Sequence, residues 1–191
     1  MLVVLVLLLV STSCAEKKAV VDNGEVAVID TNYGKIVIEF FPEAAPRHVE
    51  NFKELARENF YDGTKFHRLV KNNDRPIAIQ GGDPNSISGD PSTWGQGQRG
   101  QKTVPAEFSR TIGHERGIVS AARRGDDLNS ATSQFFICTA PNPSWNGQYT
   151  IFGKVIEGMN VVDSIARAPL LPGTDRPIDP VVVKTVTLVK K

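Results

Sequence analysis

The sequence lacks the residues that small stapled or zinc-bound domains require. Only two cysteines, Cys14 and Cys138, occur among its 191 residues, which excludes a disulfide-rich scaffold and a four-cysteine zinc site. An excess of one charge is also missing, because 22 Lys and Arg stand against 21 Asp and Glu, for a formal net charge of +1. A nearly neutral chain has no broad field that would attract nucleic acid or an anionic bilayer.

A hydrophobic run long enough for a permanent transmembrane helix is missing as well. The apolar run from Leu2 to Val10 is about half of the roughly 20 residues that a spanning helix needs. Small residues follow it from Ser11 to Ser13, so the pattern predicts a signal peptide over residues 1–13. The whole chain, with 40% hydrophobic and 23% charged residues, has the composition and length of one globular domain.

Cys14 directly follows these small residues and resembles the cysteine of a bacterial lipobox, whose thiol receives a diacylglycerol and becomes the new N-terminus. The match is incomplete, since Ser11 stands where the motif usually has leucine and no Lys or Arg precedes the apolar run. An ordinary secretory signal with a free Cys14 thiol is the alternative. We expect a lipidated N-terminus and polar tether over residues 14–23. Each buried CH₂ of an acyl chain contributes roughly 0.8 kcal/mol to membrane binding, so the protein is expected outside a bacterial cytoplasm, anchored to a membrane.

From residue 24 onward, short strand-like segments dominate the sequence. The segments 25–31 and 35–41 alternate β-branched or aromatic residues with polar ones around Asn32-Tyr33-Gly34, which predicts a hairpin. Six further strand-like runs are bounded by Gly, Pro, Asn or Asp; they cover residues 64–70, 76–80, 117–122, 133–139, 149–156 and 181–189.

Two helices are predicted among these strands. One covers about Pro46 to Asn59, with proline in the first turn and an apolar face, and the other about Met159 to Arg167. Many strands with only two helices favour a mainly β fold, a closed antiparallel β-barrel capped by two α-helices, over a doubly wound sheet. The stretch from Gly81 to Pro105, rich in Gly, Ser, Pro and Gln, reads as irregular, and segments of that length are commonly functional.

Four segments identify a family when they are taken together and in order. They are YDGTKFHRLV, IQGGDP, SQFFICTA and FGKVIEGMNVVDSI. In this order they resemble the consecutive signatures of cyclophilins, which are peptidyl-prolyl cis/trans isomerases, and the likeness covers nearly all of residues 24–191. The resemblance implies a cyclophilin-like isomerase domain that acts on proline-containing segments of unfolded or exported proteins as a monomer, without nucleic acid.

The chemistry of Xaa-Pro isomerisation determines which residue types a catalytic site needs. Rotation about the bond faces a barrier of about 18–20 kcal/mol, although the isomers differ by only about 0.5–1 kcal/mol. No bond breaks, so no nucleophile, metal or cofactor is required. In the twisted state the proline nitrogen regains a lone pair, and a fixed cationic donor aimed at it binds that state better than either planar one. Arg68, in FHRLV, is the candidate catalytic donor, since arginine stays charged and offers several donors in a rigid fork.

The remaining site residues are implied by the resemblance. Phe136 is expected to form the floor of a proline pocket, Gln80 and Gln134 to bind the peptide backbone or orient Arg68, and the backbone of Ala122 and Arg123 to hold the residues before proline. The expected pocket walls and rim are Ile77, Ala78, Trp145 and Tyr149. Cys138 is expected to be a small buried hydrophobe.

Three departures or alternatives bear on this interpretation. Ile77 and Ala78 stand where many members have phenylalanine and methionine, so a weakly active or non-enzymatic chaperone module that binds proline-containing peptides is the alternative function. The polar insert Lys71–Arg75 is expected to be a loop at the rim of the groove. A hydrolase and a metal enzyme are disfavoured, because the chain has no G-x-S-x-G elbow and its three histidines share no ligand spacing.

Overall fold

The structure, a computed structural model, describes residues 24–191. The predicted signal peptide over residues 1–13, the tether over residues 14–23 and Cys14 lie outside the described residues. No helix within residues 24–191 has the length and apolar content needed to cross a bilayer.

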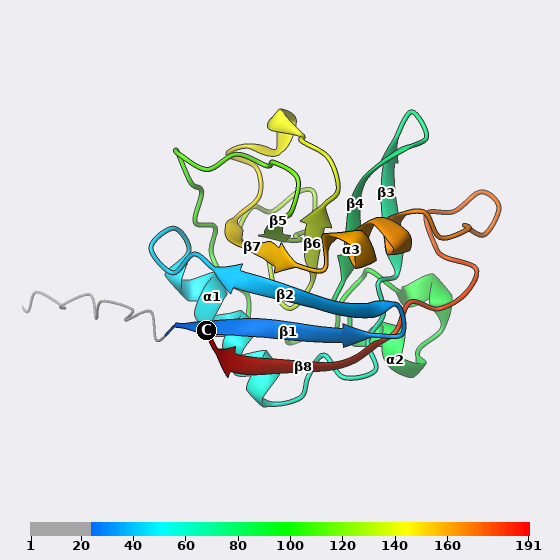
Figure 1. Cartoon of the computed structure of the whole chain (residues 1–191), viewed down its shortest axis with the longest axis horizontal. Helices are drawn as coiled ribbons and strands as arrows, with labels where there is room; N and C mark the ends of the chain where they lie inside the picture. The colour runs from blue at the N-terminus through cyan, green and yellow to red at the C-terminus, as the bar shows by residue number, and fades with distance from the viewer. Residues whose placement is uncertain (1–23) are drawn as a thin grey trace, which may run out of the picture.

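The described chain is mainly β, as expected, with eight strands and three α-helices (Figure 1). The strands are β1 Glu25–Thr31, β2 Gly34–Phe40, β3 Arg68–Asn72, β4 Arg75–Gly81, β5 Ile118–Ala121, β6 Phe135–Cys138, β7 Ile151–Glu157 and β8 Val183–Lys190. The helices are α1 Pro46–Arg57, α2 Asn85–Ser88 and α3 Met159–Ala166, with 3₁₀ turns at Pro91–Thr93 and Pro143–Trp145.

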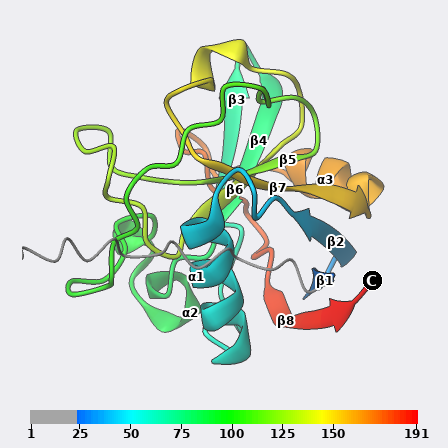
Figure 2. The same ribbon diagram turned by 90° about the vertical axis from the view of Figure 1, so that its left-hand side faces the viewer.

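The strands form one curled antiparallel sheet in the order β3-β4-β6-β5-β7-β2-β1-β8 (Figure 2). The expected closed barrel is wrong in this respect, because the sheet is a half-barrel whose edge strands are β3 and β8. A single bridge, Lys65 with Val182, joins the segments that precede these two edges. Beyond this bridge, the Leu69 N–H of β3 bonds to the Asp175 carbonyl at 2.7 Å.

The first hairpin is confirmed, with Ile29 opposite Ile36 and both side chains fully buried. The second hairpin differs from expectation, because β3 begins only at Arg68 and the insert Lys71–Arg75 extends the hairpin instead of forming a loop. Its tip places Asn73 and Asp74 at φ 48° and 61°, the left-handed region that Asn and Asp tolerate in tight hairpin turns. The β3–β4 hairpin therefore projects from the sheet (Figure 1).

Helix α1 closes one face of the sheet and packs against β7 and β8. It ends at Arg57, earlier than the predicted Asn59, since Asn59 takes a positive φ of 55°. Phe52 on its buried face lies within 5.7 Å, centroid to centroid, of four other rings, those of Phe40, Tyr61, Phe135 and Phe152. Aromatic pairs of this kind add about 0.5–1.5 kcal/mol each beyond area burial, so this ring cluster is the centre of the core.

The stretch from Gly81 to Pro105 is not structureless, which makes the expectation of two helices wrong. It contains α2 and the 3₁₀ turn Pro91–Thr93. The buried carboxylate of Asp83 organises it by accepting the N–H groups of Asn85 at 3.0 Å, Gly97 at 3.4 Å and Gly95 through a short contact. A helix of four residues has too few positions for periodicity to reveal it in the sequence.

Gly158 connects β7 to α3 at φ 86°, and its missing side chain faces the Lys35 carbonyl. We predict that Gly158→Ala lowers the melting temperature strongly, because a methyl group would add a collision with that carbonyl to the backbone strain. Gly173→Ala is the matched control, since Gly173 has φ 73° with no neighbour within 4 Å; it is expected to lose only about 1–2 kcal/mol of stability. Equal melting temperatures for the two variants in thermal denaturation would contradict the prediction.

Candidate active site

Strand β6 presents two adjacent aromatic residues to opposite faces of the sheet. Phe135 packs in the main core beneath α1, whereas Phe136 belongs to a second, smaller cluster on the other face. Periodicity predicts that the two residues point apart, and the structure decides which one faces the groove. The second cluster comprises Phe136 with Ala78, Ile118, Cys138 and Ile151, and the half-buried Phe41, Val70, Ile112, Ala122, Trp145 and Tyr149.

The ring of Phe136 is enclosed by other rings set edge-on to it. Its centroid lies 5.0 Å from that of Trp145, at 70°, and 5.4 Å from that of Tyr149, at 90°. These two rings are 6.0 Å from each other. The three expected aromatic residues are therefore brought together in one apolar box.

His114 completes this box and was not among the expected site residues. Its ring stacks on Phe136 at 6.1 Å and 16°, and it is almost fully buried. Both its backbone N–H and its Nδ1 lie 2.9 Å from Oδ1 of Asn146, so Nδ1 carries the proton and donates. Burial holds the pKa of His114 below its ordinary value. Nothing in the sequence indicates this role, because His114 lies in a loop far along the chain from Phe136.

Arg68, Gln80 and Phe136 stand in one row across three strands. Arg68 is directly opposite Gln80 in the β3–β4 pair, and Gln80 is directly opposite Phe136 in the β4–β6 pair. Directly opposed residues project from the same face of a sheet, and neighbouring strands are about 4.8 Å apart. The candidate donor and the aromatic box therefore share one face, about two strand spacings apart.

The Arg68 guanidinium is held by one carboxylate. Its Nε donates to Oδ2 of Asp175 at 3.1 Å, and both side chains are about half exposed. The hydrogen bonds within residues 24–191 leave its two terminal nitrogens free to meet a ligand. Asp175 was not expected to contribute, since it lies 107 residues further along the chain.

A hydrogen-bonded chain of amides borders the row. Gln80 Nε2 donates to Gln134 Oε1 at 3.0 Å, and Gln134 Nε2 donates to the Gly95 carbonyl at 3.0 Å. Gly95 is in turn held by the buried Asp83 carboxylate. The two expected glutamines are thus brought together, and a segment that sequence reasoning treated as irregular fixes their orientation.

Two hollows flank this amide chain and meet at Gly95 and Gln96. One, of about 550 Å³, is bordered by Arg68 and Gln80; the other, of about 300 Å³, is bordered by Ala122, Arg123 and Gln134. Together they form the groove. Phe136, Trp145 and Tyr149 are not among the residues that border these two hollows; they lie beside the groove, on the sheet face that Gln80 and Arg68 share. The Arg123 guanidinium does not reach across it, because its Nε donates to the Gln148 carbonyl at 3.0 Å and its centre lies 4.8 Å from the centroid of the Tyr149 ring.

Ile77 and Cys138 occupy less central positions. Ile77 is half-buried where the register of the β3–β4 pair shifts, and the cluster described around Phe136 does not include it, whereas Ala78 belongs to that cluster. Cys138 is fully buried, and burial raises the pKa of its thiol to about 12. Among residues 24–191, no group of three His, Cys, Asp or Glu side chains is arranged to hold a metal ion.

Comparison with known proteins fits this geometry. The family described as "Cyclophilin type peptidyl-prolyl cis-trans isomerase/CLD" matches residues 26–188. The chain belongs to this cyclophilin family. Peptidyl-prolyl cis-trans isomerase CYP18-1 of Arabidopsis thaliana is 40% identical over 162 residues, which are 84% of this cyclophilin and 93% of the plant protein. Peptidyl-prolyl cis-trans isomerase-like 2 of Gibberella zeae is 37% identical over 164 residues, 85% of this chain but only 26% of that protein, so the chain spans about a quarter of its length.

A solved structure supports the same assignment. The cyclophilin type peptidyl-prolyl cis-trans isomerase of Cryptosporidium parvum, crystallised in the presence of the dipeptide Ala-Pro, has 30% sequence identity and a TM-score of 0.75. The match covers 87% of this cyclophilin and 99% of that chain. The relatives named here are eukaryotic, and they carry no information on a bacterial lipoprotein form.

The buried histidines should make this cyclophilin less stable at mildly acidic pH than at neutral pH. The unfolded chain takes up protons on histidine below about pH 6.5, whereas burial keeps the pKa of folded His114 lower, so stability is lost as the pH falls from 6.5 towards 5.5. In His114→Gln we expect that loss to be smaller by up to about 1.4 kcal/mol per pH unit. Urea denaturation at several pH values measures the slope, and identical slopes in both proteins would contradict the prediction.

Proposed function

We propose that this protein isomerises Xaa-Pro peptide bonds in extended segments of exported proteins, with Arg68 as the catalytic donor. The observation that carries the proposal is the row formed by Arg68, Gln80 and Phe136 across β3, β4 and β6. It places a cationic fork, an amide and an apolar floor on one side of an open groove.

The proline ring would lie on Phe136, between Trp145 and Tyr149, because these rings form an apolar surface that excludes water from one side of the amide. The amides of Gln80 and Gln134 would hydrogen-bond the peptide backbone and prevent it from turning with the acyl group. Arg68 then meets the proline nitrogen, whose lone pair reappears only in the twisted state. An interaction made only in that state lowers the barrier, since it leaves both planar isomers unchanged.

Asp175 acts as a positioning residue for this donor. It holds Nε of Arg68 at 3.1 Å, so the guanidinium keeps one orientation while its terminal nitrogens stay available. The Leu69 N–H bond to the Asp175 backbone ties the same residue to β3. The donor is therefore set in place before the substrate binds, which reduces the reorganisation needed in the twisted state.

Replacing the donor tests the mechanism. We predict that Arg68→Ala lowers kcat/KM for a short Xaa-Pro peptide by about 100-fold or more with little change in melting temperature, because exposed ion pairs contribute only about 0–1 kcal/mol. Arg57→Ala is the matched control. Arg57, at the end of α1, is similarly exposed and pairs with Glu25 of β1 at 3.1 Å. The activity of this variant should equal that of the parent. Retained turnover in Arg68→Ala would refute the mechanism.

The membrane anchor is a separate part of the proposal and is supported by the sequence of the N-terminus. The apolar run Leu2–Val10, the small residues after it and Cys14 are those of a lipoprotein precursor in a bacterium. A lipid on Cys14 and the polar tether over residues 15–23 would keep a monomeric isomerase near newly exported chains. Uncatalysed Xaa-Pro isomerisation takes about 10–100 s, which is slow enough to limit their folding.

The anchor makes a prediction about fractionation. After expression in a bacterial host, Cys14→Ala should move the protein from the membrane fraction to the soluble fraction, because the acyl chains have no other attachment point. Cys138→Ala is the matched control, since that thiol is buried within β6, and it should sediment like the parent. Membrane association of Cys14→Ala, or a soluble parent, would count against the lipid.

A further inference from the structure

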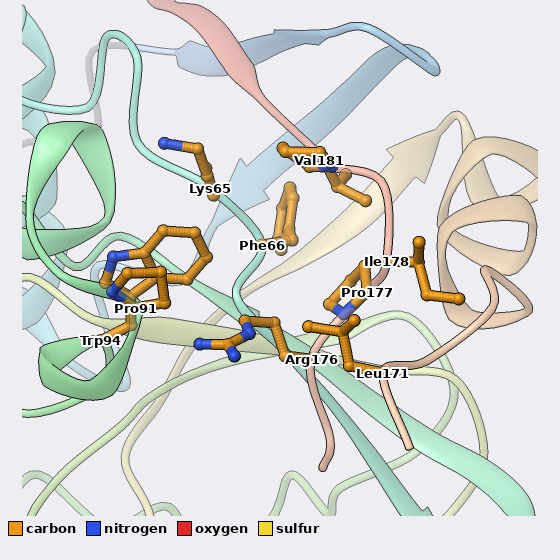
Figure 3. A pocket seen from close by; sticks show the side chains of 10 residues that line it. Lys65, Phe66, Pro91, Trp94, Leu171, Arg176, Pro177, Ile178 and Val181 are labelled. Atoms are coloured by element: carbon orange, nitrogen blue, oxygen red, sulfur yellow. The ribbon is translucent and has the colours of Figure 1, made fainter.

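An apolar pocket of about 230 Å³, drawn in Figure 3, shares lining residues with the hollow that contains Arg68 and Gln80. Figure 3 shows Trp94 and Pro91 on one side of it, Pro177 and Ile178 on the other, and Phe66 between them. Whole drug-sized ligands occupy about 300–1,000 Å³, so the size of this pocket suits a single side chain. Its lining consists of Lys65, Phe66, Pro91, Trp94, Leu171, Arg176, Pro177, Ile178, Pro180 and Val181.

The pocket adjoins the groove. Pro91, Trp94 and Arg176 line both this pocket and the hollow that contains Arg68 and Gln80. Arg176 follows the residue that holds Arg68. A peptide that extends past Arg68 therefore reaches this pocket across the wall that the two hollows share.

The walls of the pocket are fixed before any ligand binds. The Trp94 indole donates from Nε1 to the Gly89 carbonyl at 3.0 Å, and its ring lies 5.1 Å from Lys65 Nζ and 5.5 Å from the Arg176 guanidinium centre. Such cation–π contacts hold the ring in place. Across the pocket, Ile178 has 51% of its surface exposed, and a ligand side chain that covers it would remove apolar surface from water.

The order of elements along the groove indicates which part of a substrate reaches this pocket. The Ala122 end of β5 lies on one side of Phe136, and β4 and β3 with Arg68 lie on the other. If the residues before proline follow Ala122, those after it pass Arg68. The backbone of Arg68 lies two strand spacings, about 10 Å, from that of Phe136, and an extended chain advances about 3.3 Å per residue. The long Arg68 side chain can reach back to a proline on Phe136, whereas a residue two or three positions after that proline lies beside β3, where the preceding residues Lys65 and Phe66 line the pocket.

We propose that this pocket binds an apolar side chain on the second or third residue after the substrate proline, and so selects substrates by sequence on that side. The inference rests on the proposed isomerase function and deepens it. It assigns Trp94 and Ile178 to substrate selection, with no part in the rotation step itself.

The test uses the full chain in detergent micelles and a set of Xaa-Pro peptides. Leucine replaces serine singly at each of the first four positions after proline, and at the second and third positions before it. We expect leucine at the second or third position after proline to raise kcat/KM about tenfold. Ile178→Ser and Trp94→Ala should each reduce that preference to about twofold or less. With Ile178→Ser, whose side chain lines the pocket but not the hollow that contains Arg68, turnover of the all-serine peptide stays that of the parent.

Leu128→Ser is the matched control, because Leu128 is an exposed apolar residue, 44% exposed, that lines neither the pocket nor the adjoining hollow. It should keep the full preference. No preference for leucine after proline, or one that Ile178→Ser and Trp94→Ala leave intact, overturns the subsite while the isomerase proposal stands. If no peptide is turned over, the isomerase proposal fails, and the affinities of the same peptides, measured by fluorescence anisotropy, decide the subsite in the same way.

Discussion

The alternation of Phe135 and Phe136 on β6 is the constraint on which both the core and the groove depend. Phe135 faces the ring cluster centred on Phe52, and Phe136 faces the box formed by Trp145, Tyr149 and His114. A slip of one residue in the pairing of β6 would exchange the two faces. The registers of β4 and β5 against β6 are therefore as much part of the active site as its side chains.

Two aspartates from segments outside the strands set the polar side of the groove. Asp83, fully buried, gathers backbone N–H groups from the segment after β4 and through Gly95 fixes the amides of Gln134 and Gln80. Asp175 holds Arg68. A buried carboxylate is costly unless it is fully hydrogen-bonded, so Asp83 makes the loop conformation specific. The groove has fixed donors because irregular segments are tied to the sheet at these points.

This arrangement suits a reaction that breaks no bond. Acceleration must come from groups that are already oriented when the amide twists, and the site supplies them on a rigid sheet, with apolar rings on one side and charge on the other. The stretch from Gly81 to Pro105, which carries α2 and Trp94, and the segment around Asp175 adjoin the same end of the groove. The residue that holds Arg68, the proposed catalytic donor, and residues that line the additional pocket thus come from the same segments.

The sequence by itself indicated where the strands, α1 and α3 lie and which residues form the family signatures, because periodicity and local turn chemistry act within a few residues; the limits of β3, β4 and α1 differed from those expected. Arg68, Gln80 and Phe136 could be named from their motifs, and the signal peptide and tether predicted over residues 1–23 rest on the sequence alone. Only the tertiary structure decided that the sheet stays open between β3 and β8, that Phe136 shares a face with Arg68 and Gln80, and that His114 stacks on Phe136 and Asp175 holds Arg68. Those features arise from contacts between segments far apart in the chain; Arg68 and Asp175, for example, are 107 residues apart. A local sequence pattern cannot indicate which distant side chain will contact a given residue.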